Sequence, residues 1–283
     1  MKILDLKNPF GAPVYHAETV TTTFDAARVL AGQNEPHGTV VAADFQEAGR
    51  GRLNRSWKTE RGKSLLFTIL LRYADIPSIP AALTLKTGLA VSLAIEDFAP
   101  ALAGSVWIKW PNDIMIVRRQ AQAAVKTQAA VKAAGILTEG DGRNVYIGVG
   151  VNVTQREFPE EYRSKAGSII QALPDTPEGN LSHDKSPRRF PDDIRFVLLE
   201  KILTRLYMEI ETPEKAGPWR ERLTRRLYKK GELVTFASGA ANSDDLVRGI
   251  LSGIGSGGEL LIIPGGEKTE RAFVTGELRV YGD

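Results

Sequence analysis

The pattern of apolar residues changes near Lys230, and no other feature constrains the fold of this chain as strongly. Before this point, long apolar strands alternate with segments in which apolar residues recur at helical spacing. After it, Glu232–Asp283 is rich in glycine and carries short strands with alternating side chains. The first pattern is typical of a mixed sheet backed by helices, and the second of a small β-barrel. We therefore predict an α+β protein with two domains, residues 1–230 and 231–283.

Individual elements follow from the same periodicities. Helices are predicted at Thr23–Gly32, Ala81–Phe98, Asp193–Glu211 and Pro218–Lys230. Strands of the larger region are predicted at Thr39–Phe45, Ser64–Tyr73, Ser105–Trp110, Asp113–Val117, Ala134–Glu139 and Asn144–Val153, with a hairpin turn at Asp141-Gly142. Strands of the C-terminal region are predicted at Leu233–Phe236, Leu246–Ile254, Glu259–Ile263 and Ala272–Tyr281.

The composition excludes several classes of protein. The chain has 283 residues, no cysteine, and a formal net charge of +3 with a pI near 9.0. Without cysteine there are no disulfides and no thiolate metal sites, which suits the cytosol. The charge excess is small for this length and is typical of an ordinary surface. The N-terminal segment lacks the apolar run of a signal peptide, and no stretch is expected to span a membrane.

Two segments interrupt the predicted elements. Gln120–Lys132 contains QAAVK twice, as a local tandem duplication, and its Ala and Lys residues favour an extended loop or a short helix. Leu173–Pro191 is rich in Pro, Asp, Ser, Gly and Asn, which predicts a mobile surface loop. Neither segment indicates a function by itself.

A glycine- and arginine-rich loop is the strongest candidate site. Gln46–Trp57, here called the arginine loop, reads QEAGRGRLNRSW and lies between two predicted strands. Glycine allows tight turns and a close approach of the backbone to a ligand. Arg50, Arg52 and Arg55 supply forked, permanently charged donors that match phosphates and carboxylates. Such a loop could hold a triphosphate beside a carboxylic acid, although a solvated basic turn has the same composition.

Three further segments carry polar groups suited to this chemistry. Lys109–Ile114 reads KWPNDI, in which a proline turn presents an amide and a carboxylate at a strand edge. Lys132–Glu139 reads KAAGILTE and places a lysine beside a small-residue turn, where it could meet an anion. Tyr146–Val153 reads YIGVGVNV, and its alternating glycines would let a ligand lie against the strand backbone. Each of the three is weak alone, because turns and surface lysines are common.

In this order and spacing, the four segments resemble the catalytic domain of biotin protein ligases. The matching motifs are GRGRxxRxW at Gly49–Trp57, KWPNDI at Lys109–Ile114, KxxGILxE at Lys132–Glu139 and GxGxN at Gly148–Asn152. More loosely, Thr22 to Arg28 is similar to the segment that begins the family's first helix, and Gly276–Arg279 to part of its C-terminal domain. The resemblance implies a mixed sheet related to class II aminoacyl-tRNA synthetases, followed by an SH3-like domain.

The resemblance also implies an activity and a set of site residues. The expected enzyme makes biotinyl-5'-AMP from biotin and ATP, with Mg²⁺ on the triphosphate, and transfers the biotin to a lysine of a biotin carboxyl carrier protein. The implied catalytic residues are Arg52, Lys132 and Asp113. The implied biotin-binding residues are Thr22, Thr23, Gln46, Gly49, Arg50, Arg52, Trp57, Lys132 and Gly135. The implied ATP-binding residues are Arg50, Arg52, Arg55, Trp57, Lys109, Asn112, Lys132 and Asn152. The sequence offers no carboxylate cluster for Mg²⁺.

Grouped cations suit this chemistry, because a carboxylate that attacks a phosphate faces charge repulsion. The chain nevertheless departs from the family at several positions. Asn54 stands where glycine is usual, and asparagine tolerates a left-handed backbone. Phe24 replaces a polar residue and Thr22 a serine, which alters the expected contacts to biotin. Within the duplication Lys132 fits the motif, and Lys126 is expected to be a solvated spacer.

Other functions fit the sequence less well. A lipoate or octanoate ligase of the related fold is the main alternative, but it would not be expected to combine the GRGR and KWPND motifs. A non-catalytic binder would be expected to lose Arg52 or Lys132. No DNA binding is predicted, because a helix-turn-helix has no room before Thr19 and the basic cluster Arg220–Lys230 has the spacing of a solvated helix face.

Location, assembly and loop motion complete these expectations. We expect a cytoplasmic enzyme without membrane contact. A homodimer paired through sheet edges is compatible with the family. The arginine loop is expected to become ordered when ligand binds, because a charged, glycine-rich loop has little to bury.

Overall fold

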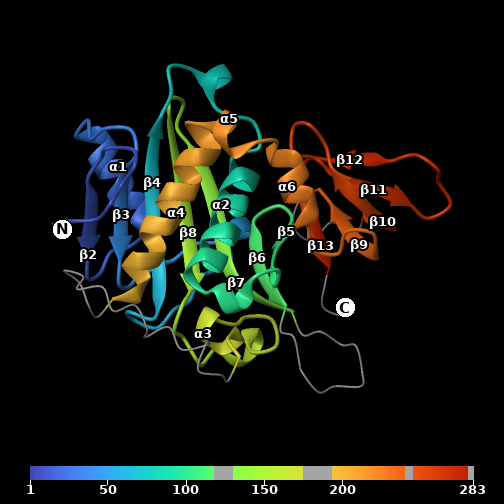
Figure 1. Ribbon diagram of the computed structural model, residues 1–283, viewed down its shortest axis with the longest axis horizontal. Helices are drawn as coiled ribbons and strands as arrows, with labels where there is room; N and C mark the ends of the chain where they lie inside the picture. Colours follow the sequence, from blue (N-terminus) through green and yellow to red (C-terminus); the bar gives the residue numbers. More distant parts are fainter. Residues whose placement is uncertain (118–129, 175–192, 240–244, 280–283) are drawn as a thin grey trace.

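The computed structural model describes residues 1–117, 130–174, 193–239 and 245–279. Its main element is an eight-stranded mixed sheet of order β1-β2-β3-β4-β8-β7-β6-β5 (Figure 1). The strands are β1 (Lys2–Leu4), β2 (Val14–Ala17), β3 (Thr39–Ala43), β4 (Ser64–Arg72), β5 (Val106–Lys109), β6 (Asp113–Val117), β7 (Ala130–Gly140) and β8 (Asn144–Asn152). β2 and β3 are parallel, and the other neighbours pair antiparallel.

Helices pack on both faces of this sheet, because its central strands carry apolar residues on both sides. α1 (Thr23–Gly32) packs on one face through Phe24 and Leu30. α2 (Leu83–Phe98) and α4 (Ile194–Ile210) pack against each other and against the opposite face (Figure 1). Shorter helices are α3 (Ile169–Ala172), α5 (Pro213–Ala216) and α6 (Trp219–Arg225), with 3₁₀ turns at Arg52–Asn54, Ile76–Ser78, Pro100–Leu102 and Glu160–Tyr162.

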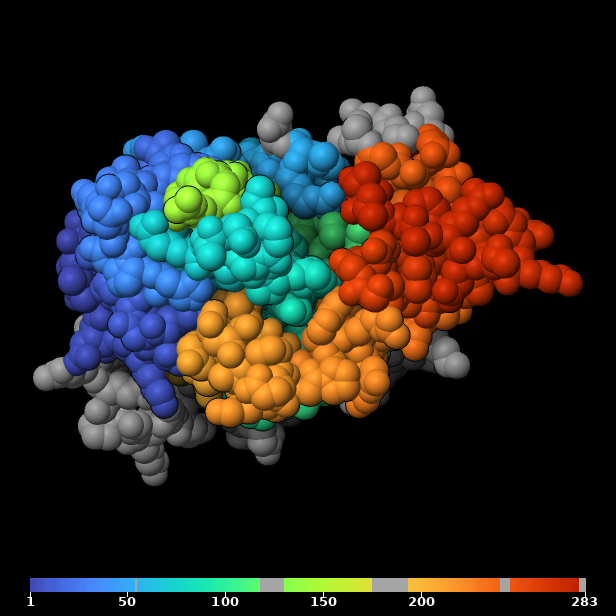
Figure 2. Space-filling model, turned by 90° about the horizontal axis from the view of Figure 1, so that it is seen from above, coloured from blue at the N-terminus to red at the C-terminus, as the bar shows by residue number. Residues whose placement is uncertain are grey.

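A second sheet follows at the C-terminus. It has five antiparallel strands in the order β12-β11-β10-β9-β13 and lies beside the β5 end of the large sheet (Figures 1 and 2). Its strands are β9 (Leu233–Ser238), β10 (Leu246–Ile254), β11 (Leu260–Pro264), β12 (Arg271–Phe273) and β13 (Gly276–Arg279). The Trp110 indole donates to Gly258 O (2.9 Å), and its ring meets Phe236 edge-on at 5.9 Å, so one apolar core joins the two sheets.

The predicted α+β class is confirmed, and the domain boundary near Lys230 stays a prediction. Some elements differ from expectation. β1 and β2 were not predicted, because they are short strands, of three and four residues, with weak patterns. The single strand predicted at Ala272–Tyr281 is wrong, because Gly276 takes a positive φ of 142° and separates β12 from β13, which occupy opposite edges.

The two interrupting segments fall largely outside the described residues. Leu173 and its neighbour Pro174 end the described part before 175–192. Of Gln120–Lys132, only the last three residues are described, and they belong to β7. The expectation that Lys132 lies in a loop beside a turn is therefore wrong.

One helical stretch has the length and composition of a membrane span. Ile76–Phe98 is long enough and apolar enough to cross a membrane, so the expectation that no stretch would be was too strong. In the fold, Leu85, Leu89 and Ile95 of this stretch are buried against the large sheet and α4. Its apolar character is therefore that of a core helix.

Candidate active site

A pocket of about 840 Å³ lies on the α1 face of the large sheet. Its walls come from α1, the arginine loop, strands β6 to β8, the segment Phe158–Ala166 and the C-terminal sheet. The predicted residues that line it are Thr23, Gln46, Arg50, Arg52, Arg55, Trp57, Lys109, Asn112, Asp113, Lys132, Gly135 and Asn152. Predicted residues as far apart in sequence as Thr23 and Asn152 therefore meet at one site, where the sheet supplies the floor.

A β-bulge turns the Lys132 side chain toward this pocket. In the register between β6 and β7, Ile114 faces Ala134 and Met115 faces Lys132, so Ala133 is an extra residue. Side chains of a regular strand alternate between faces, and residues three apart would point to opposite sides. The bulge places Lys132 and Gly135 on the same face, beside Asp113.

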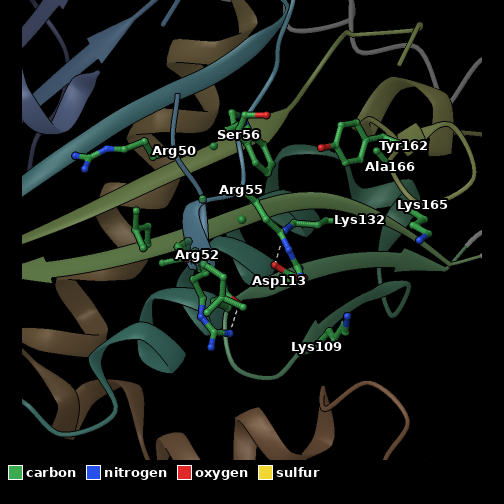
Figure 3. A pocket seen from close by; sticks show the side chains of 18 of the residues that line it. Arg50, Arg52, Arg55, Ser56, Lys109, Asp113, Lys132, Tyr162, Lys165 and Ala166 are labelled. Atoms are coloured by element: carbon green, nitrogen blue, oxygen red, sulfur yellow. Dashed lines mark hydrogen bonds and ion pairs between the residues drawn. The ribbon is translucent and has the colours of Figure 1, made fainter. Parts of the chain in front are cut away.

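Lys132 is paired there with a carboxylate. Its Nζ lies 2.6 Å from Asp113 Oδ1, and the two side chains are 33% and 16% exposed (Figure 3). Lys109, opposite Asp113 in the β5–β6 hairpin, is buried, and burial lowers the pKa of its amine. The strands thus present two lysines and one carboxylate to the pocket.

The arginine loop folds back on itself beside these strands. Gly51 N donates to Arg55 O (2.7 Å) and Trp57 N donates to Gly49 O (2.8 Å). A Cβ on Gly49 would lie 2.5 Å from Trp57 O, so this position requires glycine. The left-handed residue of the turn is Leu53, with φ 59° and ψ 36°. The expectation that Asn54 takes this conformation is wrong.

Two arginines of the loop reach across the pocket. Arg52 Nη1 donates to Asn112 Oδ1 (3.2 Å) and Nη2 to Gly276 O (3.5 Å), and burial lowers the pKa of its guanidinium. Arg55 donates to both carboxylate oxygens of Glu277 (2.8 and 2.7 Å). This hydrogen-bonded pair raises the pKa of Arg55 and lowers that of Glu277. Both contacts join the loop to β13.

Arg50 points away from this cluster (Figure 3). Its Nη2 lies 3.9 Å from Asp25 Oδ1 and from Glu139 Oε2, and its guanidinium lies over the Phe24 ring at 5.8 Å. The structure therefore brings Arg52 and Arg55 together with Lys109 and Lys132, and it places Arg50 at the α1 end of the pocket.

The glycines of β8 allow two aromatic side chains to lie against the strand. A Cβ on Gly148 would lie 2.2 Å from the Phe24 ring, and one on Gly150 would lie 2.7 Å from the Trp57 indole. These two aromatic side chains thus lie against the strand, and the expectation that a ligand does so stays a prediction. Trp57 Nε1 is buried without a hydrogen-bond partner within the described residues.

A polar recess closes the α1 end of the pocket. Thr23 N and Thr23 Oγ1 both donate to Gln46 Oε1 (2.8 and 3.0 Å). Thr23 is buried at the start of α1, and Gln46 is half-buried after β3. This recess offers hydrogen-bonding groups at the α1 end of the pocket.

Three predicted residues either lie outside the pocket lining or use a polar group within the protein. Thr22 caps α1, accepting from Asp25 N (3.0 Å), and lies outside the pocket lining. Gly49 also lies outside the lining, within the loop turn. Asn152 lines the pocket but its Nδ2 donates to Gly167 O (3.1 Å). Their roles toward biotin and ATP stay predictions.

Some lining residues carry no recognisable sequence signal. The segment Phe158–Ala166 forms one wall and is held by Lys132 N, which donates to Lys165 O (2.8 Å). Glu277 belongs to the C-terminal similarity but no site role was expected for it. Outside the lining, Thr68 is a polar residue inside the apolar strand β4, and this signal could have drawn attention to it.

Within the described part of the chain, no group of three or more His, Asp or Glu side chains could hold a metal ion. The basic cluster Arg220–Lys230 is largely neutralised, since Arg222 pairs with Glu209, Arg226 with Glu96 and Lys229 with Glu232. These ion pairs offset part of the positive charge of the cluster, and the absence of DNA binding stays a prediction.

Comparison with known proteins gives a consistent family. Residues 17–152 match the Biotin/lipoate A/B protein ligase family. The chain is 38% identical over 167 residues to the bifunctional ligase/repressor BirA of Bacillus subtilis, covering 56% of this chain and 46% of that protein. It is 32% identical over 168 residues to the biotin–[acetyl-CoA-carboxylase] ligase of Mycobacterium tuberculosis, covering 58% and 57%. The chain thus spans about half the length of the curated relatives it matches.

The fold is also similar to a solved structure. The biotin protein ligase of Aquifex aeolicus, in complex with biotin and ATP, superposes with a TM-score of 0.69 at 26% identity. The match covers 94% of this chain and 97% of that one, so it includes both sheets.

Proposed function

We propose that this chain, whose residues 17–152 match the biotin/lipoate A/B protein ligase family, is a biotin protein ligase. The observation that carries the proposal is the arrangement of the pocket. Four cations, Arg52, Arg55, Lys109 and Lys132, gather at one end, and the Thr23–Gln46 recess lies at the other. A molecule with a polar head, an apolar body and a carboxylate tail fits this order, with ATP at the cationic end.

In the first step, a biotin carboxylate oxygen attacks the α-phosphorus of ATP. A new phosphorus–oxygen bond forms, the bond to the β-phosphate oxygen breaks, and pyrophosphate leaves. Lys132 and Arg52 offset the negative charge that builds between the two reacting anions. Asp113 fixes the position of the Lys132 amine at 2.6 Å, and Asn112 fixes Arg52.

In the second step, the amine of an acceptor lysine attacks the carbonyl carbon of biotinyl-AMP. An amide forms, AMP leaves with the electron pair of the anhydride bond, and the amine loses a proton. Asp113 is the carboxylate placed to orient this amine, since it is the one on the pocket floor beside Lys132.

Mg²⁺ bound to the triphosphate would supply charge neutralisation at the phosphates. In the described part of the pocket, Asp113 and Glu277 are both ion-paired with cations, so they are poor ligands as they stand. Mg²⁺ commonly keeps several bound waters and takes most of its other ligands from phosphate oxygens. Such an ion would need few protein ligands, which agrees with the ion-paired carboxylates of this pocket.

The polar recess also favours biotin over lipoate or octanoate. Biotin ends in a cyclic urea that can use the hydrogen-bonding groups of Thr23 and Gln46. Lipoate and octanoate have apolar ends, which would make no hydrogen bond to these groups. Lipoate or octanoate ligation is therefore the second candidate.

Partners and location follow from the proposed activity. The acceptor is a biotin carboxyl carrier protein of a carboxylase, reached in the cytoplasm. A homodimer and the absence of DNA binding remain predictions, which sedimentation and electrophoretic mobility shift measurements test.

The test is biotin-dependent exchange of labelled pyrophosphate into ATP by the purified chain. We expect exchange with biotin and none with lipoate or octanoate. Exchange with lipoate or octanoate in place of biotin would assign the chain to the second candidate function. No exchange with any of the three acids would contradict adenylation.

A further inference from the structure

We infer that Thr68 is a positioning residue that fixes the hydrogen-bond polarity of the recess through Thr23. This inference rests on the proposed biotin-binding function. Thr68 lies on β4, is fully buried, and is absent from the pocket lining. Its Oγ1 lies 2.8 Å from Thr23 Oγ1, behind the pocket wall.

The direction of each hydrogen bond follows from what the atoms can donate. Thr23 N lies 2.8 Å from Gln46 Oε1, and a backbone N–H can only donate. The Gln46 oxygen therefore lies on this side, which also settles the orientation of the amide. Thr23 Oγ1 is 3.0 Å from the same oxygen, which carries no proton, so the Thr23 hydroxyl donates to it.

Thr68 must then be the donor in the third bond. A hydroxyl has one proton, and the Thr23 proton is already used toward Gln46. The Thr68 hydroxyl consequently donates to Thr23 Oγ1. The result is a chain Thr68→Thr23→Gln46 in which every proton points the same way, and such chains strengthen each bond in turn.

This chain decides what the recess offers to a ligand. Thr23 Oγ1 keeps one lone pair, so it acts as an acceptor toward the pocket. Gln46 Nε2, for which no partner is found among the described residues, acts as a donor on the side near Gly49. An acceptor and a donor side by side complement the N–H and C=O of a cyclic urea.

The experiment measures KM for biotin and for ATP in the pyrophosphate exchange assay. Thr68→Val removes the hydroxyl and keeps the shape of the side chain. We expect it to raise KM for biotin about three- to tenfold, the effect of losing one hydrogen bond, and to leave KM for ATP within about twofold. Thr68→Ser restores the hydroxyl and should restore KM for biotin.

A double-mutant cycle separates a role through Thr23 from a general loss of structure. If Thr68 acts through Thr23, Thr68→Val should add nothing to KM for biotin in a Thr23→Val background. The matched control is Thr87→Val, because Thr87 is equally buried and donates to Leu83 O within α2 at 2.9 Å. Should Thr68→Val not fold, Thr68→Ala removes the hydroxyl without adding a methyl group.

The outcomes are distinct. An unchanged KM for biotin in Thr68→Val, an equal rise in KM for ATP, or additivity with Thr23→Val would overturn the inference and leave the ligase function standing. Failure of the wild-type chain to catalyse biotin-dependent exchange would instead remove the function on which the inference rests.

Discussion

The two cationic halves of the pocket are held in place by different means. Lys109 and Lys132, called here the strand half, lie on strands, and their positions are set by the register and bulge of the sheet. Arg52 and Arg55, called here the loop half, lie on the arginine loop. They are held by contacts to Asn112 and to β13, which are distant from the loop in sequence. The strand half is partly buried and the Arg55 side chain is 61% exposed.

This difference indicates that the two pairs of cations have different roles. A group fixed by a sheet can be preorganised for the reacting atoms, which stabilises charge as it develops. A group on a loop can close over a ligand and open again, because few buried contacts hold it. Changes to Lys109 and Lys132 should therefore lower the rate of adenylation, and a change to the exposed Arg55 or to its partner Glu277 should mainly alter loop closure.

The largest effect is expected for Lys132→Ala. Removing a preorganised cation from the reacting centre should lower the biotin-dependent exchange rate about 10²–10³-fold. Lys2→Ala, an exposed lysine of β1, is the control and should keep the wild-type rate. A Lys132→Ala rate within tenfold of wild type would contradict the role of the strand half.

The next effect is expected for Asp44, whose contacts anchor the segment just before the arginine loop. Asp44 precedes Gln46 and is bonded to His16 (3.0 Å) and to Arg195 (2.7 Å), a buried arginine of α4. Burial alone would raise the pKa of Asp44, but these hydrogen bonds outweigh it and hold the pKa below the usual 3.8. Asp44→Asn should reduce the free energy of unfolding by about 2–3 kcal/mol at neutral pH.

The pH dependence of this loss has a definite sign. Because the native pKa is depressed, the contribution of Asp44 is fully present above its unfolded pKa and disappears as the pH falls through the native value. The difference between wild type and Asp44→Asn in urea unfolding should be constant from about pH 8 to 5 and shrink below about pH 4. Asp97→Asn, which breaks an exposed pair with Arg205, should cost at most about 1 kcal/mol. Equal losses of unfolding free energy in the two variants would contradict the anchoring role of Asp44.

A smaller effect is expected where the loop rests on the sheet. Gly150→Ala places a methyl group about where the Trp57 indole lies, 2.7 Å from its nearest atom. The indole must shift, which should destabilise the fold by about 1–2 kcal/mol and raise KM for ATP. Gly32→Ala, where a Cβ meets nothing within 4 Å, is the matched control. Thermal unfolding and KM values equal to wild type would show that Trp57 does not depend on this glycine.

The same comparison explains how much could be predicted from the sequence. Strong periodicity gave α1 and the long strands, and the motifs identified most of the residues that line the pocket. The bulge at Ala133 could not be predicted, because it depends on pairing with β6. Leu53 rather than Asn54 takes the left-handed backbone, since contacts across the loop override local preference.

Contacts between distant segments were the main omission. Thr68 reaches the recess only through tertiary contact with Thr23, and Glu277 meets Arg55 across 222 positions of sequence. Local patterns carry no information on such pairs. The motifs could therefore predict which residues line the pocket, but not which of them lie together in the cationic cluster, as the separate position of Arg50 demonstrates.

The smallest effect is expected for Glu277→Gln, which weakens the contact between the loop and the C-terminal sheet. The Arg55–Glu277 pair is largely exposed on the arginine side, so its loss should increase loop opening only about two- to fivefold. The measurement is limited tryptic cleavage after Arg50, Arg52 and Arg55, followed by mass spectrometry. Biotin and ATP should slow this cleavage in wild type and, less strongly, in the variant.

The control for this measurement lies in the same sheet. Glu267 pairs with Arg271 four residues away and does not touch the loop, so Glu267→Gln should leave cleavage unchanged. Equal cleavage in wild type and Glu277→Gln would mean that β13 does not hold the loop. Faster cleavage with an unchanged exchange rate at saturating ATP would assign the contact between Glu277 and Arg55 to loop closure and not to the chemical step.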